Sequence, residues 1–296
     1  MNSFLRAIGF SKYTSKNSIR DLISAAAIYP EAMDYINEDS IGKIYEFKNF
    51  YADGIGIKFY GSESDDLDYE IDYFVPFVEG NKSILPTDLS IEKRYSNFSF
   101  IASCEDLRVG VSMIFHLTNP MDYMNFIMSD SADATPFRVC FSALSLMGTI
   151  LLPINLSPGD ARKQRMDTSK RSKLIAAARD GDEGAIESLT FDDMDTYAKI
   201  SRRIQKEDVF SIVESSFMPY GLESDLYTII AEIDEVSSYT NRITNELIYR
   251  IVLSYNDVPI TLAINSLDLV GEPMVGRRFK GTIWLQGQVL FNMEEK

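Results

Sequence analysis

Hydrophobic and polar residues alternate along residues 276–291, the last long segment of the chain. One face carries Phe279, Ile283, Leu285, Val289 and Phe291, and the other carries Lys280, Thr282, Trp284, Gln286 and Gln288. A period of two over this length predicts one long, half-buried strand. Gly281 and Gly287 interrupt the apolar face, which is typical of a strand that bends around a small barrel.

Three further segments alternate in the same way, at residues 227–233, 247–255 and 258–264. Asn256-Asp257 separates the last two and predicts a two-residue hairpin. With the final strand, these segments predict a small antiparallel barrel in residues 218–296. We expect four or five strands, in an arrangement of the oligonucleotide/oligosaccharide-binding (OB) kind or similar to it.

Residues 1–157 mix helical and strand patterns. A capping box at Ser18 and Asp21 predicts a helix with its apolar residues at helical spacing over residues 19–27. Residues 55–59 and 67–77 predict a hairpin across a polar turn. Pro76 is expected to end its pairing, because proline lacks the N–H that a sheet uses.

A second strand pair is predicted at residues 98–103 and 109–117, followed by a helix that Asn119 caps and Pro120 begins. Residues 144–154 are almost wholly apolar and fit either a buried strand or a core helix. Together these patterns predict an α+β fold for residues 1–157.

The segment 158–217 has a different character. Ser157-Pro158-Gly159 marks its start, and basic residues follow from Arg162 to Arg179. Gly181 is expected to end one helix, and Thr190 with Asp193 to cap another. We therefore predict three parts: an N-terminal mixed sheet-and-helix domain (1–157), a helical connector (158–217) and the C-terminal barrel (218–296), in the α+β class.

The net charge is −15, and the chain has two cysteines, Cys104 and Cys140. An anionic protein is repelled as a whole by nucleic acid and by membrane surfaces. No apolar run is long enough to span a bilayer, and two cysteines do not make a disulfide framework. A reducing cytoplasm is the expected location.

His116 is the sole histidine, so a Cys–His catalytic pair is the sharpest enzymatic hypothesis. If Cys104 and Val109 flank a hairpin turn, His116 lies on the order of 23 Å from Cys104, at ~3.3 Å per residue. This is too far for a hydrogen bond, whereas Cys140 stays open as a partner. We predict no catalytic residue, and a hydrogen-bonded histidine at the polar end of a strand.

An acidic run could hold a hard cation, with carboxylates at Glu63, Asp65, Asp66, Asp68 and Glu70. It lacks the central glycine and terminal glutamate of an EF-hand loop, so a solvated acidic turn is favoured. No complete phosphate-binding glycine loop is present either. We therefore predict no metal and no cofactor.

The basic stretch 162–179 lacks interleaved aromatic residues and is diluted by acids, which favours pairing within the chain or simple solvation. The barrel offers a second candidate. In it, aromatic side chains stack on bases, namely Tyr249, Tyr255 and Trp284, and basic side chains neutralise phosphates, namely Arg277, Arg278 and Lys280. Acids outnumber bases in that region, which argues against a nucleic-acid groove. Trp284 is either covered by the connector or offered to a partner.

Several segments also resemble a known family. They are the opening Phe4-Leu5-Arg6-Ala7-Ile8-Gly9-Phe10, the stretch Val109 to Asn119, the run Asp195 to Asp208, the Phe217-Met218-Pro219-Tyr220-Gly221 turn, and the closing Phe279 to Gly287. In these segments the chain resembles domain-of-unknown-function family 3881, of gut clostridia and related Firmicutes. The resemblance implies a bacterial cytoplasmic protein without an assigned activity, so it supplies no functional residues.

The sequence therefore favours a non-enzymatic binding or protein-interaction module, with an unknown protein partner or a homo-oligomer. A carboxylate-based enzyme acting on a small molecule is the first alternative. A weak single-strand nucleic-acid binder that uses the barrel is the second. Nucleic acid is disfavoured by the charge, and no membrane partner is expected.

Overall fold

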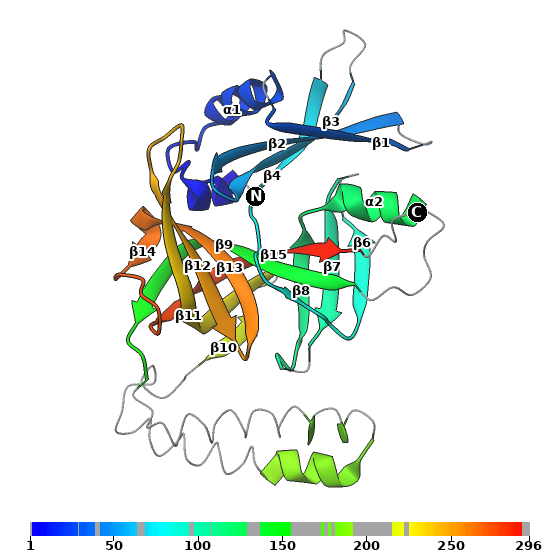
Figure 1. The fold of residues 1–296 in the computed structure, drawn as a ribbon, viewed down its shortest axis with the longest axis vertical. Helices are drawn as coiled ribbons and strands as arrows, with labels where there is room; N and C mark the ends of the chain where they lie inside the picture. Colours follow the sequence, from blue (N-terminus) through cyan, green and yellow to red (C-terminus); the bar gives the residue numbers. More distant parts are fainter. Residues whose placement is uncertain are drawn as a thin grey trace.

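The structure, a computed structural model, is mostly β and contains a closed five-stranded barrel. In Figure 1 the sheet formed by β1 to β4 lies on one side of the barrel and the strands β6 to β8 lie on another. The described residues are 2–28, 30–38, 42–63, 69–94, 98–106, 108–128, 137–154, 173–174, 177–178, 181–191, 215–221 and 225–291.

The N-terminal sheet is antiparallel, in the order β1 (Ala32–Glu38), β2 (Gly42–Ala52), β3 (Ile55–Glu63) and β4 (Tyr69–Val78). The predicted hairpin is confirmed as β3–β4. Its pairing does not end at Pro76 but continues to Val78. Strand β4 is at the edge of the sheet, so no further strand requires the backbone N–H that Pro76 lacks. The Pro76 carbonyl accepts a hydrogen bond from the side chain of Gln286.

Helix α1 (Lys16–Ile28) packs its apolar residues against this sheet, as its spacing predicted. It begins earlier than predicted. Ser15, and not Ser18, is the N-cap residue, because the Ser15 hydroxyl accepts the Ser18 backbone N–H.

The barrel consists of β9 (Arg138–Leu151), β11 (Leu226–Thr240), β12 (Leu247–Tyr255), β13 (Val258–Asn265) and β15 (Arg278–Leu290). It closes because β15 pairs with both β9 and β11. Asn256 and Asp257 both have positive φ, which confirms the predicted two-residue turn between β12 and β13.

One barrel strand, β9, precedes the predicted connector, and it runs parallel to β13. A purely antiparallel barrel within residues 218–296 is therefore a wrong prediction. The ambiguous segment 144–154 proves to be largely strand. It is apolar on both faces because one face lines the barrel interior and the other is covered by the N-terminal part of the chain.

Further strands extend the sheet outside the barrel. From β15 it continues through β8 (Ser112–Leu117), β7 (Phe100–Glu105) and β6 (Leu89–Lys93). The predicted pair is thus confirmed as β7–β8. Short strands β5 (Ser83–Ile84) and β14 (Leu269–Val270) pair with β9, and β10 (Ser216–Pro219) pairs with β11. Helix α2 (Pro120–Met128) follows β8 at the predicted position, and a short helix, η2 (Ser266–Asp268), follows β13.

The described residues form two hydrophobic cores. The first lies inside the barrel and against β7 and β8, and the second lies between the N-terminal sheet and the outer face of the barrel. The short helix η1 (Asn2–Ile8) belongs to the second core, where Leu5 and Ile8 have no exposed surface. As a result β15 is buried on both faces, and the predicted half-buried strand is corrected.

Gly281 of β15 lies opposite Gly148 of β9, and the ring of Phe279 covers both glycines. A Cβ at either position would overlap that ring. The pairing register shifts between Thr282 and Ile283, directly after Gly281. The register shift therefore lies close to Gly281, one of the two glycines at which the sequence predicts a bend in the strand.

Little of the predicted connector is among the described residues. Gly181 has φ +89°, and its N–H and that of Asp182 bond back to Ala178 and Ala177, which confirms that a helical segment ends there. Thr190 is not a cap, because it lies inside a helix at residues 183–191. Asp193 and the basic residues 162–171 lie outside the described residues. The division into three domains stays a prediction, although strands from both sides of residue 157 share the barrel sheet.

Candidate functional site

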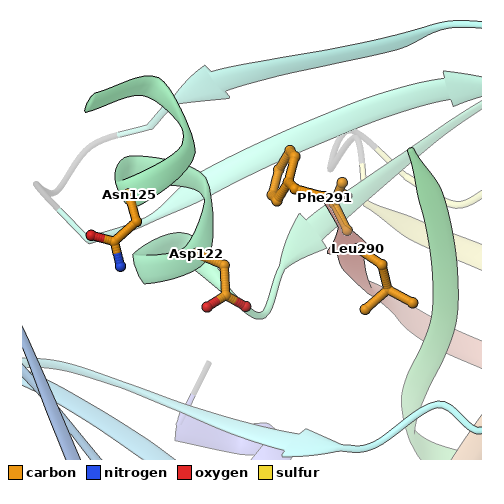
Figure 2. A pocket seen from close by; sticks show the side chains of 5 residues that line it. Asp122, Asn125, Leu290 and Phe291 are labelled. Carbon is orange, nitrogen blue, oxygen red and sulfur yellow. The ribbon is translucent and has the colours of Figure 1, made fainter. Parts of the chain in front are cut away.

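A cleft of about 250 Å³ lies between α2 and the end of β15. Figure 2 shows the side chains of Asp122 and Asn125 on the helix, across from Leu290 and Phe291 at the strand's end. Val289 completes the lining. The cleft thus combines one carboxylate, one amide and an apolar floor.

Asn119 fixes the helix to the strand. Its side-chain amide donates to the carbonyl of Val289 and accepts the Val289 N–H, so it pairs with β15 as a neighbouring strand would. Asn119 also donates to Asp122 Oδ2 at 2.8 Å. The residue that the sequence marked as a helix cap therefore holds one wall of the cleft to its floor.

Aromatic stacking holds Phe291 in place. Its ring stacks on Phe126 with centroids 4.6 Å apart and on Tyr123 at 6.1 Å, and Tyr123 meets Phe100 edge to face at 5.5 Å. Burial raises the pKa of Tyr123. The side of the cleft formed by Phe291 is therefore a stacked aromatic wall of the kind that binding sites use for apolar or cationic groups.

The exposed rim of the cleft is acidic and apolar. Asp122 and Asn125 are exposed, and Asp122 forms no ion pair with any described residue. Leu290, which lines the cleft, leaves 36% of its surface exposed. A negative charge without an ion-pair partner among the described residues, next to an open apolar side chain, suits a ligand that is basic and partly apolar.

Trp284 is 4% exposed. Its ring packs against Phe4 at 4.9 Å and His116 at 5.2 Å, and its Nε1 donates to Asp225 Oδ2 at 3.0 Å. The indole is thus covered and its N–H has an acceptor, but the predicted cover by the connector is not what the described residues show. Among the described residues the cover comes from the N-terminal helix η1 and from β8.

The other predicted binding residues do not form one surface with Trp284. Tyr249 packs against the barrel's interior core. Arg278 is 5% exposed and donates to the carbonyl of Leu152, Arg277 donates to that of Glu272, and Lys280 is half-buried. Their role in binding stays a prediction.

His116 is 1% exposed, and burial lowers its pKa to about 4, with Arg94 and Lys58 adding to the effect and Asp225 opposing it. In the β7–β8 pair it lies opposite Ile101, whereas Cys104 lies opposite Met113. His116 and Cys104 are thus three positions apart along the strands, and their side chains belong to opposite faces of the sheet. Three positions correspond to about 10 Å, so the separation of ~23 Å expected from the sequence was too long. Burial raises the pKa of Cys104 to about 12 and that of Cys140 as well, which leaves both thiols protonated and buried.

The acidic run places Glu63 at the end of β3 and Glu70 at the start of β4, paired with Tyr69 and Ser62. Asp65, Asp66 and Asp68 lie outside the described residues. In the part of the chain that the structure describes, no three His, Cys, Asp or Glu side chains converge as metal ligands.

Sequence reasoning missed Asp122 and Asn125. The signal was present, because a helix starting at Pro120 puts residues 122 and 125 on one face, three positions apart. The other half of the cleft, Leu290 and Phe291, is remote in sequence. Nothing in the chain's pattern indicates that the last strand ends beside this helix.

No curated protein and no solved structure matches this chain. None of the described helices is both long and apolar enough to cross a membrane. A family model described as "Domain of unknown function, E. rectale Gene description (DUF3881)" matches residues 5–287. This match covers nearly the whole chain, and the chain therefore belongs to the DUF3881 family, as the resemblance of its segments indicated.

Proposed function

We propose that the protein is a non-enzymatic interaction module, whose cleft between α2 and β15 takes a basic, partly apolar segment of a partner protein. The observation that carries this proposal is Asp122, an exposed carboxylate without an ion-pair partner among the described residues, facing the stacked ring of Phe291. A lysine or arginine side chain would satisfy the carboxylate, and its aliphatic stem would pack on the ring.

Charge complementarity supports a basic partner. The net charge of −15 attracts positive segments at long range and repels nucleic acid. The exposed side chain of Leu290, which lines the cleft, would add apolar contact beside the central charge. We propose a bacterial cytoplasmic location, consistent with the two buried cysteines that form no disulfide.

We also propose that the barrel is OB-like in its strand pairing. Strands β11, β12 and β13 form a meander, β15 returns to β11, and β9 pairs antiparallel with β15 and parallel with β13. This is the cyclic order of an OB barrel, with its single parallel pair between the third and fifth strands. Here the fifth strand, β9, comes before the first in the chain, as in a circular permutation.

The outer face of β12 and β13 corresponds to the surface on which OB barrels bind ligands. In this protein the face meets the chain's own N-terminal part: Asn265 donates to the Arg6 carbonyl and Arg250 to that of Glu79, and Asn241, in the turn before β12, donates to that of Ile8. Ile248 and Ala263 on this face have no exposed surface. This occupancy favours the α2 cleft over the barrel face as the binding surface, and disfavours the nucleic-acid alternative.

The carboxylate-enzyme alternative would be favoured by two carboxylates that converge in one cavity. Among their lining residues, the α2 cleft has one carboxylate, Asp122, and a smaller cavity between the N-terminal sheet and the barrel also has one, Glu79. Each therefore lacks the second carboxylate, which is why the binding role is preferred.

A phage library of random dodecapeptides, selected on the full chain, tests the proposal. We expect the enriched peptides to carry Lys or Arg next to an aromatic or aliphatic residue. A fluorescein-labelled peptide from the selection should bind Asp122→Asn at least about tenfold more weakly, the loss of one charge-assisted contact worth ~1.4 kcal/mol. Asn at this position can still accept the bond from Asn119, so the helix keeps its anchor.

The matched control is Asp88→Asn, which removes an exposed carboxylate from the loop before β6 and should bind the peptide as the wild type does. Leu290→Lys should also abolish binding, because it places a positive charge on the cleft floor. Enrichment without basic residues, or equal peptide affinity of wild type and Asp122→Asn, would contradict the proposal. Peptides that bind the Asp122→Asn protein but lose affinity in a barrel variant such as Lys280→Ala would move the site to the barrel.

A further inference from the structure

A second, smaller cavity of about 40 Å³ lies where the N-terminal sheet meets the barrel. Both sheets contribute to it. Its lining residues are Lys48, Lys58, Phe77, Val78, Glu79, Gly80, Thr118, Ser142 and Gln288. A space of this size suits a small group such as a carboxylate or a phosphate, and not a larger ligand.

Lys58 brings a positive charge into this buried place. The residue is 8% exposed, and its ammonium group forms an ion pair with Glu46 at 3.1 Å. Among the described residues Glu46 is its one ion-pair or hydrogen-bond partner. An ammonium group has three N–H donors, and a buried donor without an acceptor is costly, so two donors still require acceptors from the cavity.

Lys48 points to the same place. Its ammonium group bonds Glu79 at 2.7 Å and lies 5.2 Å from the centroid of the Phe77 ring, and the Lys58 ammonium lies 5.9 Å from that centroid. One aromatic ring thus positions both cations at the cavity wall. Glu79 occupies one donor of Lys48, and because the Lys48 side chain is 24% exposed, either water or an anion in the cavity can accept the other two.

The remaining polar wall also offers donors. Ser142 is 2% exposed, and Gln288 is half-buried. Neither side chain hydrogen-bonds another described residue. Thr118, in contrast, is already engaged, because its hydroxyl donates to the carbonyl of Gly287.

From this arrangement we propose that the cavity is a binding site for a small oxyanion, a carboxylate or a phosphate group, held by Lys48, Lys58, Ser142 and Gln288. Glu46 and Glu79 offset the two lysine charges, so the site is an electrically balanced cluster of donors and not a strongly positive pocket. The oxyanion oxygens would accept the N–H and O–H groups that lack acceptors. Because both sheets supply ligands, binding would also stabilise the contact between them.

Calorimetric unfolding of the full chain tests this inference with sodium phosphate and sodium acetate, each compared with sodium chloride at equal ionic strength. We expect one of the two oxyanions to raise the unfolding temperature in a saturable way, by about 5 °C at a hundredfold excess over its dissociation constant. Phosphate alone would identify a phosphate group as the ligand, and acetate alone a carboxylate.

Two variants locate the effect. Lys48→Met and Ser142→Ala should each reduce the saturable rise at least severalfold, the second without any change in charge. Lys82→Met is the matched control, because Lys82 forms a solvent-exposed pair with Glu235 away from the cavity lining, and it should respond as the wild type does. A rise of equal size in chloride, no saturable rise in either oxyanion, or an undiminished rise in Ser142→Ala and Lys48→Met would overturn the proposal.

Discussion

Trp284 and Asp225 are joined by a buried hydrogen bond, from the indole Nε1 to carboxylate Oδ2 at 3.0 Å. Asp225 is 4% exposed, and the same oxygen also accepts from Arg94 at 3.1 Å. The bond links the start of β11 to the middle of β15, the point at which the barrel closes. A single carboxylate therefore satisfies the chain's only indole and a neighbouring guanidinium.

Asp225→Ala should lower the free energy of unfolding by about 2–3 kcal/mol, because it leaves a buried indole N–H without its acceptor and breaks a partly buried ion pair. Urea unfolding followed by circular dichroism measures the change. Asp88→Ala, at an exposed carboxylate, serves as the control and should cost less than about 0.5 kcal/mol. Equal stability of the two variants would show that the Asp225 bonds contribute little.

The fluorescence of Trp284 should be blue-shifted in the native protein and poorly quenched by iodide, because Phe4 and His116 cover the ring. As the chain has one tryptophan, the signal has a single origin. Phe4→Ala opens the cover from the η1 side and should increase quenching. Native emission and quenching equal to those of the urea-unfolded chain would refute the burial of this residue.

Stability should fall as the pH is lowered from 7 to 4. Burial lowers the pKa of His116 from 6.5 to about 4, so below pH 6.5 the unfolded chain binds a proton that the native protein does not. Linkage then removes about 3 kcal/mol of unfolding free energy by pH 4. His116→Gln should lack this component, so its stability relative to the wild type should improve over the same range.

Other groups contribute equally to both proteins in that comparison. One such group is Asp106. Burial acts to raise the pKa of Asp106, but the hydrogen bonds and the charge of Arg108 outweigh this effect, so the pKa is lowered and the charged form is favoured. Stability from Asp106 is therefore lost at lower pH, in wild type and variant alike. Parallel pH profiles for wild type and His116→Gln would contradict the assignment to the histidine.

Gly148→Ala should destabilise the barrel by about 2 kcal/mol, because the added Cβ would overlap the ring of Phe279. Neighbouring side chains in a packed interior can shift only slightly to relieve such an overlap. Phe279→Leu removes that ring and creates a cavity of its own. The double variant should therefore cost less than the sum of the two single variants, a coupling that denaturant unfolding can measure. Additive costs would mean that the glycine is not there to accommodate the ring.

Local patterns determined much of this fold. The alternation in residues 247–264, the turn at Asn256-Asp257 and the helix start at Pro120 depend on neighbours in the chain, so they could be predicted from the residues themselves. The helical half of the candidate site could also have been predicted from the sequence, since Asp122 and Asn125 lie on one face of the helix that begins at Pro120.

Long-range pairing decided the rest. The chain does not indicate that β9 inserts between β13 and β15 or runs parallel to β13, because a strand's own pattern specifies its faces but not its neighbours. The same limit explains β15, whose face with Trp284 and Gln286 has a surface pattern yet is buried by the N-terminal sheet and η1. The sequence by itself determined the strands, turns and charge of this protein, whereas only the tertiary structure decided which polar faces are buried and which distant residues form the α2 cleft and the cavity between the two sheets.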